Sequence, residues 1–355
     1  MKKHNFSAGP AILAPEVLQQ ASKAVAELDG IGLSLVEISH RSKEFIAIMD
    51  EACQLAFELS GLEGKGYKVM FLQGGASLQF LMAAYNLLNT KAGYINTGTW
   101  SEKAIKEAKL LGEVVELASS KDQNYNYIPK NVAIPHDLDY VHITTNNTIF
   151  GTQYKTLPQT TAPLVADMSS DIFSRSLDYS KFGLIYAGAQ KNLGPAGTAL
   201  IIIKESLLEA VSRTIPSMLS YKIHADKDSM FNTPPVFAVY TTMLNMRWIK
   251  AQGGLAAVSE KNAFKASMLY KEIDRNSKFK GFAASEDRSD MNATFNLVDQ
   301  NEAASFDSLW QSAGISGLKG HRSVGGYRAS IYNALPLDSI ELLVDCMQTF
   351  EKNNS

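Results

Sequence analysis

Short apolar runs recur along the first two thirds of the chain, separated by stretches with helical periodicity. An apolar run of about four to eight residues bounded by turn-forming residues is typical of a buried strand. Runs of this kind predict seven strands, at Tyr67–Leu72, Gly93–Asn96, Glu113–Leu117, Tyr140–Thr144, Leu164–Met168, Leu184–Ala187 and Ala199–Ile203.

Apolar residues at helical spacing predict helices before and between these strands. The predicted helices are Pro15 to about Leu28, a helix capped by Ser42 that extends to about Leu59, Ala76 to Leu88, and Ser101 to Leu111. Strands interleaved with helices indicate an α/β fold, with a mostly parallel sheet covered by helices on both faces. In such a sheet, ligands bind beyond the carboxyl ends of the strands. Five candidate residues lie just after a predicted strand or at its end: Gly74, Trp100, Thr148, Asp167 and Lys191.

The pattern changes from about Ser259. A long helix is followed by a strand near 293–298, a helix near 303–313, a strand near 327–331 and a final helix near 337–350, which predict a smaller α+β domain. The first ten residues have no clear periodicity and predict an extended arm. We therefore expect a large domain at residues 15–258 and a small domain formed by residues 1–14 and 259–355.

The loop after the strand Leu184–Ala187 carries one lysine, Lys191. Gly194, Pro195 and Gly197 prevent a helix there, so Lys191 lies on a tight loop between two core strands. A desolvated lysine has a lowered pKa, which suits its amine to covalent attachment of a carbonyl cofactor. On this loop alone, an ordinary surface lysine is an equally good interpretation.

A second strand end favours the cofactor interpretation. The apolar run Leu164–Met168 carries Asp167 at its carboxyl end, 24 residues before the lysine. An aspartate and a lysine at the ends of neighbouring strands are what pyridoxal phosphate (PLP) requires. The lysine binds the cofactor covalently, and the aspartate keeps the pyridine nitrogen protonated so that the ring withdraws electrons.

Seven motifs in order along nearly the whole chain resemble the phosphoserine aminotransferases, a family of fold-type-I PLP enzymes of class V. The motifs are Asn5-Phe-Ser-Ala-Gly-Pro10, Ser39-His-Arg-Ser-Lys-Glu-Phe45, Gly74-Gly-Ala-Ser77, Ala166-Asp-Met-Ser-Ser170, Gly188-Ala-Gln-Lys-Asn-Leu-Gly-Pro195, Asn232-Thr-Pro-Pro235 and Gly320-His-Arg-Ser-Val-Gly-Gly-Tyr-Arg-Ala-Ser330. The resemblance implies reversible amino transfer between 3-phospho-L-serine and 2-oxoglutarate, giving 3-phosphohydroxypyruvate and L-glutamate, in L-serine biosynthesis. It leaves open whether 4-phosphohydroxy-L-threonine, of pyridoxine biosynthesis, is also used.

Several residues are expected to hold the cofactor. Gly74–Ser77 opens a helix directly after a strand, which makes an anion site for the cofactor phosphate, with Ala76 and Ser77 at its start. Some relatives carry Arg at position 77, so Ser77 removes one positive charge that must be compensated elsewhere. The resemblance implies that Trp100, otherwise a core aromatic, stacks on the ring. It also implies that Thr148 bonds the ring hydroxyl and that Gln190 reaches the phosphate, although Asn147 stands where many relatives have Glu.

The remaining candidates concern a partner subunit and the substrate. The two prolines after Asn232 and Thr233 fix a loop, and the resemblance implies that this loop binds the PLP phosphate of a second subunit, so that a homodimer shares its active sites. The substrate-binding set is His40, Arg41, His321, Arg322 and Arg328. Arginine suits carboxylate and phosphate, although each of these residues alone is more often a surface ion-pair residue. We expect no metal ion at the site.

Composition excludes other classes of protein. A net charge of −2 with 20% charged residues gives no indication of a nucleic-acid or membrane partner, and no apolar run approaches the roughly 20 residues of a membrane span. The N-terminus lacks an apolar signal core, so we expect a cytoplasmic protein.

The same fold supports desulfurases and lyases, but a desulfurase needs a mobile nucleophilic cysteine, and Cys53 and Cys346 lie in helix-like stretches. A non-enzymatic PLP-binding regulator would need a partner-binding module, for which 355 residues leave little room.

Overall fold

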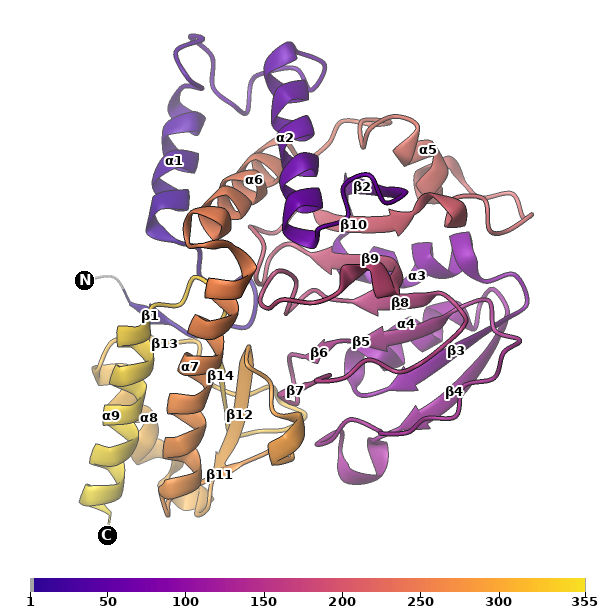
Figure 1. Ribbon diagram of the computed structural model, residues 1–355. Helices are drawn as coiled ribbons and strands as arrows, with labels where there is room; N and C mark the ends of the chain where they lie inside the picture. Colours follow the sequence, from indigo (N-terminus) through magenta and orange to yellow (C-terminus); the bar gives the residue numbers. More distant parts are fainter. Residues whose placement is uncertain (1–2, 355) are drawn as a thin grey trace.

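The computed structural model describes residues 3–354. Its centre is a seven-stranded sheet in the order β2-β10-β9-β8-β5-β3-β4 (Figure 1). The strands are β2 (Tyr67–Leu72), β3 (Lys91–Asn96), β4 (Glu113–Ser119), β5 (Val141–Thr144), β8 (Leu164–Asp167), β9 (Phe182–Gly188) and β10 (Ala199–Lys204). Neighbouring strands are parallel except at β10, which is antiparallel to both β2 and β9. The predicted seven-stranded, mostly parallel sheet is confirmed.

Helices cover both faces of this sheet because alternate strand residues point to opposite sides. Val69 and Phe71 of β2 pack into a core with α1 (Pro15–Ala26), α2 (Lys43–Ser60) and α6 (Val236–Ala251). Met70 and Leu72 pack on the other side, in a core with α3 (Gly75–Leu87), α4 (Thr99–Ala108) and α5 (Tyr221–Ala225). The cap of α2 is confirmed, since the hydroxyl oxygen of Ser42 accepts a hydrogen bond of 3.3 Å from the backbone N–H of Phe45.

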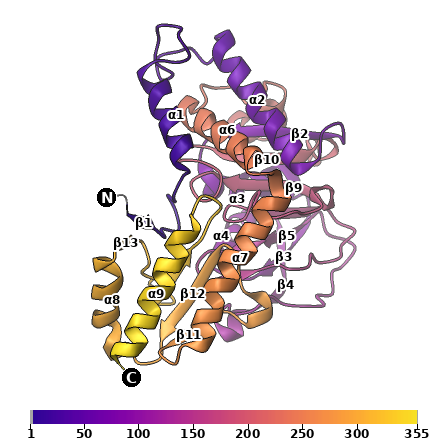
Figure 2. The same cartoon turned by 60° about the vertical axis from the view of Figure 1, so that its left-hand side comes forward.

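The C-terminal part has its own antiparallel sheet in the order β11-β12-β14 and its own apolar core. Its elements are α7 (Gly254–Arg275), β11 (Phe279–Gly281), β12 (Asn292–Leu297), α8 (Ala303–Ser312), β13 (Ile315–Ser316), β14 (Tyr327–Ser330) and α9 (Leu337–Asn353). The N-terminal strand β1 (His4–Asn5) pairs in parallel with β13, and Phe6 belongs to the same core (Figure 2). The expected packing of the arm against this part is therefore confirmed. The division of the chain at residues 14 and 258 remains a prediction, and α7 runs through the second boundary.

Two local features differ from the sequence-based expectation. The fourth helix begins at Thr99 and not at Ser101, so Trp100 lies in its first turn and Gly98 is the residue that caps it. The elements that were not predicted include the helices α5 and α6 and the short strands β11 and β13. A further short hairpin, β6 (Asn146–Asn147) with β7 (Thr152–Gln153), follows β5.

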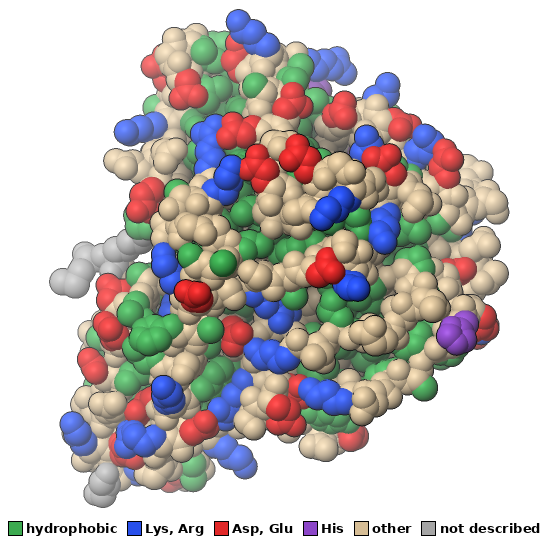
Figure 3. Space-filling model, in the orientation of Figure 1, with side chains coloured by type: hydrophobic (Ala, Val, Ile, Leu, Met, Phe, Trp, Pro, Cys, Tyr) green, Lys and Arg blue, Asp and Glu red, His purple; other side chains and the backbone are tan. Residues whose placement is uncertain are grey.

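Acidic and basic side chains are interspersed over the face of the molecule drawn in Figure 3. Within residues 3–354, none of the helices is both long and apolar enough to traverse a bilayer. The same residues contain no group of three or more His, Cys, Asp or Glu side chains arranged to hold a metal ion.

Candidate active site

The carboxyl ends of β8 and β9 define the site. These neighbouring strands are parallel, so Asp167 at the end of β8 and the turn after β9 lie at the same edge of the sheet. Lys191 lies in that turn, which is closed by a hydrogen bond of 2.7 Å from the N–H of Gly194 to the carbonyl of Ala189. A Cβ at Gly194 would lie 2.3 Å from the hydroxyl of Thr242, so the turn packs against α6 only with glycine here.

The Lys191 side chain lies among polar, aromatic and backbone groups. Its Nζ donates a hydrogen bond of 2.7 Å to Oγ1 of Thr148 and lies 5.1 Å from the ring centroid of Trp100. Gly9 of the N-terminal arm lies against its side chain, since a Cβ there would be 3.2 Å from Cγ. Burial lowers the pKa of Lys191 to about 8, the positive charge of Arg328 adds to this, and Asp167 opposes it. The amine is therefore deprotonated more readily than that of an ordinary lysine.

Asp167 is 4% exposed, and only one of its carboxylate oxygens is engaged. Oδ1 accepts hydrogen bonds from the N–H of Ser169 at 2.9 Å and from its hydroxyl at 2.6 Å. Within residues 3–354, no donor hydrogen-bonds to Oδ2. Burial raises the pKa of Asp167, while Lys191 and Ser169 oppose the shift. A buried carboxylate with a free oxygen beside a lysine fits the protonated ring nitrogen of PLP.

The N-terminus of α3 forms a cradle at the same edge. Gly74 precedes the helix with φ of 87°, and no side chain caps the first turn. Gly188 faces this turn, because a Cβ there would lie 2.9 Å from Oε1 of Gln190 and 3.3 Å from the N–H nitrogen of Ala76. Uncapped N–H groups at a helix start and the positive end of the helix dipole favour an anion. The cradle therefore fits the cofactor phosphate, with Ser77 exposed beside it.

Arg328 reaches the site from β14. Its guanidinium donates a bond of 3.4 Å to the carbonyl of Thr148, its Nε is buried without a partner, and it forms no ion pair with any carboxylate in the part of the chain that the structure describes. Burial lowers the pKa of His321, and the charges of Arg328, Arg322 and Lys103 lower it further. These cations therefore lie near one another and form a region suited to an anionic ligand. Lys103, whose Nζ lies 4.7 Å from the ring centroid of Trp100, was not found from the sequence.

Two pairs of expected site residues do not contact Lys191 of the same chain. His40 and Arg41 lie in the loop before α2, where the N–H of Arg41 bonds the hydroxyl of Ser39. The loop with Asn232 and Thr233 lies beside Gln73, which donates to the carbonyl of Thr233 and accepts a bond of 3.3 Å from Asn232. No hydrogen bond or ion pair among the described residues joins either group to Lys191.

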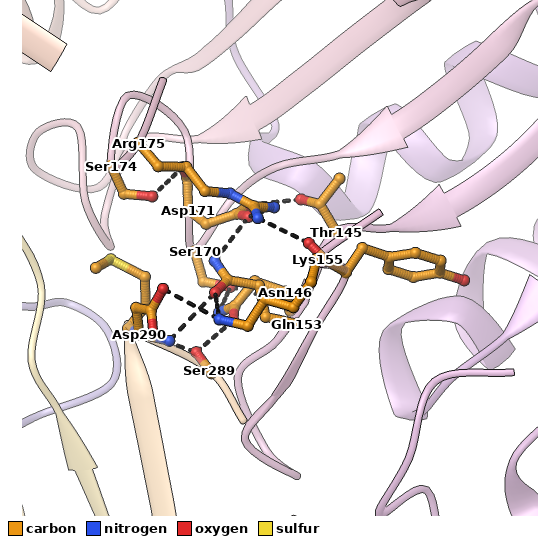
Figure 4. A network of polar contacts seen from close by, with 12 residues as sticks. Thr145, Asn146, Gln153, Lys155, Ser170, Asp171, Ser174, Arg175, Ser289 and Asp290 are labelled. Atoms are coloured by element: carbon orange, nitrogen blue, oxygen red, sulfur yellow. Dashed lines mark hydrogen bonds and ion pairs between the residues drawn. The ribbon is translucent and has the colours of Figure 1, made fainter. Parts of the chain in front are cut away.

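A buried polar network behind the site was missed by sequence reasoning (Figure 4). Asp171, 1% exposed, accepts hydrogen bonds from Thr145, Gln153 and Arg175. The hydroxyl of Thr145 lies within hydrogen-bond distance of the Asp167 carbonyl as well, at 3.1 Å, which fixes the end of β8. The spacing of four residues between the two aspartates and the arginine is a sequence signal that could have identified this support.

The network also connects the central sheet to the C-terminal part. The Asn146 amide donates to Ser170 at 2.8 Å and to Asn292 of β12 at 2.7 Å. Ser289, just before β12, donates back to the amide oxygen of Asn146. These hydrogen bonds between uncharged groups fix β12 against the segment that follows β5. Because β12 pairs with β14, they also fix the position of Arg328.

This fold and site belong to a known class of transferase. The family model described as aminotransferase class-V matches residues 3–343, and the chain belongs to this family. The phosphoserine aminotransferase of Flavobacterium johnsoniae is 62% identical over 353 residues, which are 99% of each chain. The solved phosphoserine aminotransferase from Bacillus circulans subsp. alkalophilus is 43% identical with a TM-score of 0.97, covering 100% of this chain and 99% of that one. The PLP-bound phosphoserine aminotransferase from Trichomonas vaginalis is 34% identical with a TM-score of 0.92, covering 98% and 100%.

Proposed function

We propose that the chain is a phosphoserine aminotransferase. It transfers an amino group reversibly between 3-phospho-L-serine and 2-oxoglutarate, giving 3-phosphohydroxypyruvate and L-glutamate for L-serine biosynthesis. The observation that carries this is Lys191 beside Asp167 at the ends of parallel strands. Arg328, which forms no ion pair within residues 3–354, donates to the carbonyl of Thr148, whose hydroxyl bonds the Lys191 amine. Relatives that share this name cover the whole length of the chain.

The cofactor is pyridoxal phosphate, which supplies an electron-withdrawing ring that stabilises negative charge at the substrate Cα. Lys191 would hold it covalently, and Asp167 would keep a proton on its ring nitrogen. Trp100 would lie against the ring and exclude water, and Thr148 would bind the ring hydroxyl. The residues for the cofactor phosphate are Ala76, Ser77 and Gln190, joined by Asn232 and Thr233 of the partner subunit.

Lys191 carries the proton transfer. The Lys191 amine would remove the proton from the substrate Cα as general base and return a proton as general acid. Its lowered pKa suits both roles, because the amine exchanges protons near neutral pH. Thr148, which already bonds Nζ at 2.7 Å, positions the amine. The amino group remains on the enzyme between substrates, so the kinetics are ping-pong.

The cysteines argue against a desulfurase. Burial raises the pKa of the Cys53 thiol to about 12, with the charges of Asp50 and Asp228 as further causes. Burial likewise raises the pKa of Cys346 to about 11. Both side chains lie in regular helices, α2 and α9, and a thiol with a raised pKa is a poor nucleophile.

A panel of amino donors tests the proposed function. With 2-oxoglutarate as acceptor, phosphoserine should greatly exceed serine, alanine and aspartate in kcat/KM. Adding 4-phosphohydroxy-L-threonine to the panel decides whether it is a second substrate. A preference for an unphosphorylated donor, or release of sulfide, carbon dioxide or ammonia, would refute the assignment.

The two anionic ends of the substrate should be bound by different residues. We expect Arg328→Ala to impair phosphoserine, glutamate and alanine alike, because Arg328 binds the α-carboxylate common to all three. Arg41→Ala and Arg322→Ala should impair phosphoserine and glutamate only, since these residues, with His40 and His321, bind the distal phosphate or γ-carboxylate. Loss of one charge-assisted bond removes about 1.5–3 kcal/mol, or roughly ten- to a hundredfold in kcat/KM. Equal damage to the alanine reaction in Arg41→Ala would show that this division of roles is wrong.

The active sites should be shared in a cytoplasmic homodimer. His40, Arg41, Asn232 and Thr233 have no described contact with Lys191 of their own chain, and Thr233 is exposed. Dilution to the point of dissociation should therefore release PLP and activity together, as followed by sedimentation with absorbance and turnover on the same samples. A fully active monomer would contradict the shared site.

A further inference from the structure

The structure contains a buried lysine that the proposed mechanism does not use. Lys265 lies in α7 and is 4% exposed. Its Nζ donates hydrogen bonds to three backbone carbonyls, those of Ile331 at 3.2 Å, Tyr332 at 2.8 Å and Leu335 at 3.1 Å. Lys265 has no carboxylate partner anywhere in residues 3–354. Three converging carbonyl oxygens around one positive charge resemble the coordination that proteins offer a bound monovalent cation.

The segment that these carbonyls belong to reaches the active site. The Asn333 N–H donates a bond of 3.0 Å to the side chain of Asn192, the residue after Lys191. The hydroxyl of Tyr332 bonds the carbonyl of Ala8 at 2.8 Å in the N-terminal arm. The same segment directly follows β14, which carries Arg328. A shift of residues 331–335 would therefore displace the lysine turn, the arm and the substrate arginine together.

We propose that Lys265 is a positioning residue whose ammonium group takes the place of a bound cation and fixes residues 331–335 against α7. The charge is required because an ammonium has three N–H donors for the three carbonyls, whereas a neutral amine has only two. Burial lowers the pKa of Lys265 to about 7, with Lys261 as the second cause. Hydrogen bonds to the charged form of a group favour that form.

A pocket gives access to this site from solvent. A cavity of about 330 Å³ between α1, α6, α7 and the 331–335 segment is lined by Lys265, Asn262, Trp248 and Leu335, among others. Shortening Lys265 to alanine removes a fragment equivalent to propylammonium and leaves its carbonyl partners beside this opening. The vacated position should then bind propylammonium added to the solution.

The test combines melting temperature with turnover. Lys265→Ala should lower the melting temperature by about 5 °C or more, because three buried carbonyls lose their donors. At a temperature well below that transition, kcat/KM for phosphoserine should fall about tenfold. Propylammonium should reverse at least half of both losses. Tetramethylammonium, a cation without N–H donors, should not do so at the same concentration.

Two further variants serve as controls for Lys265→Ala. Lys265→Met should show the same losses without rescue, since its side chain fills the position without a charge. Lys261→Ala should cause neither loss, because this exposed lysine lines the same pocket but donates to the side chain of Gln252, and its removal takes a like charge away from Lys265. If Lys265→Ala does not fold, its refolding yield in propylammonium against tetramethylammonium gives the same comparison.

Native-like stability and turnover of Lys265→Ala, or losses that propylammonium does not reverse, would overturn the proposal. The turnover measurement rests on the proposed amino transfer, whereas the melting temperature does not. Failure of the assigned reaction would therefore appear as an inactive wild type with an intact pattern of thermal rescue.

Discussion

Lys191→Ala should abolish amino transfer while leaving the protein folded. Lys191 lies in the turn that follows β9, where its amine bonds Thr148 and forms no ion pair within residues 3–354. The variant loses both the covalent attachment of PLP and the base that removes the Cα proton. General acid–base catalysis alone contributes about 10²–10⁴-fold, so kcat should fall by at least about 10³-fold. Steady-state turnover of phosphoserine with 2-oxoglutarate measures this, and the absorbance of covalently bound PLP should vanish as well.

The matched control is Lys181→Ala. Lys181 lies just before the same strand, β9, and is exposed, with no ion pair to any residue of the range 3–354. Its replacement should leave turnover and PLP absorbance unchanged. If Lys191→Ala retained near-native turnover, the assignment of Lys191 as the catalytic lysine would be wrong.

Asp167→Asn should be nearly as damaging, although the amide preserves the size of the side chain. An amide carries no negative charge, so it cannot hold the ring nitrogen protonated, and the ring then withdraws electrons poorly. We expect kcat to fall by several orders of magnitude and PLP to dissociate more readily. Turnover and the PLP content after gel filtration should be measured on the same preparation.

Asp50→Asn is the control for this substitution. Asp50 is exposed on α2 and forms no ion pair with the residues that the structure describes, so its change to an amide should alter neither quantity. If Asp167→Asn turned over phosphoserine like the wild type, the role of Asp167 at the ring nitrogen would be wrong.

The central sheet could be predicted from the sequence because its strands are buried on both faces. The run Phe182–Gly188 is buried throughout, and strands of this kind appear in the sequence as continuous apolar stretches. The helix α6 was missed for a related reason. Ten of its 16 residues are buried and they surround the helix, so no polar face gives the amphipathic periodicity by which helices are recognised. The strands β11 and β13 have three and two residues, too few for a period.

The candidate site was predictable where function coincides with a strand end. Asp167 and Lys191 stand out because one is a charged residue near the end of an apolar run and the other lies in the tight turn that follows the next such run. Lys103 and Asp171 do not, since their roles arise from proximity across the fold. Lys103 acts on His321 of a distant loop, and Asp171 binds Thr145 after β5, Gln153 of β7 and Arg175 of its own segment. Arg41 stays a prediction because its proposed contact requires a second subunit.

Tracing the amino nitrogen tests the central claim most directly. The wild-type protein is supplied with PLP, 2-oxoglutarate and phosphoserine labelled with ¹⁵N, and the products are analysed by mass spectrometry. The proposed chemistry predicts that the label appears in glutamate, in equal amount to the 3-phosphohydroxypyruvate formed, with none in ammonium. Label released as ammonium, or unlabelled glutamate beside consumed phosphoserine, would contradict it.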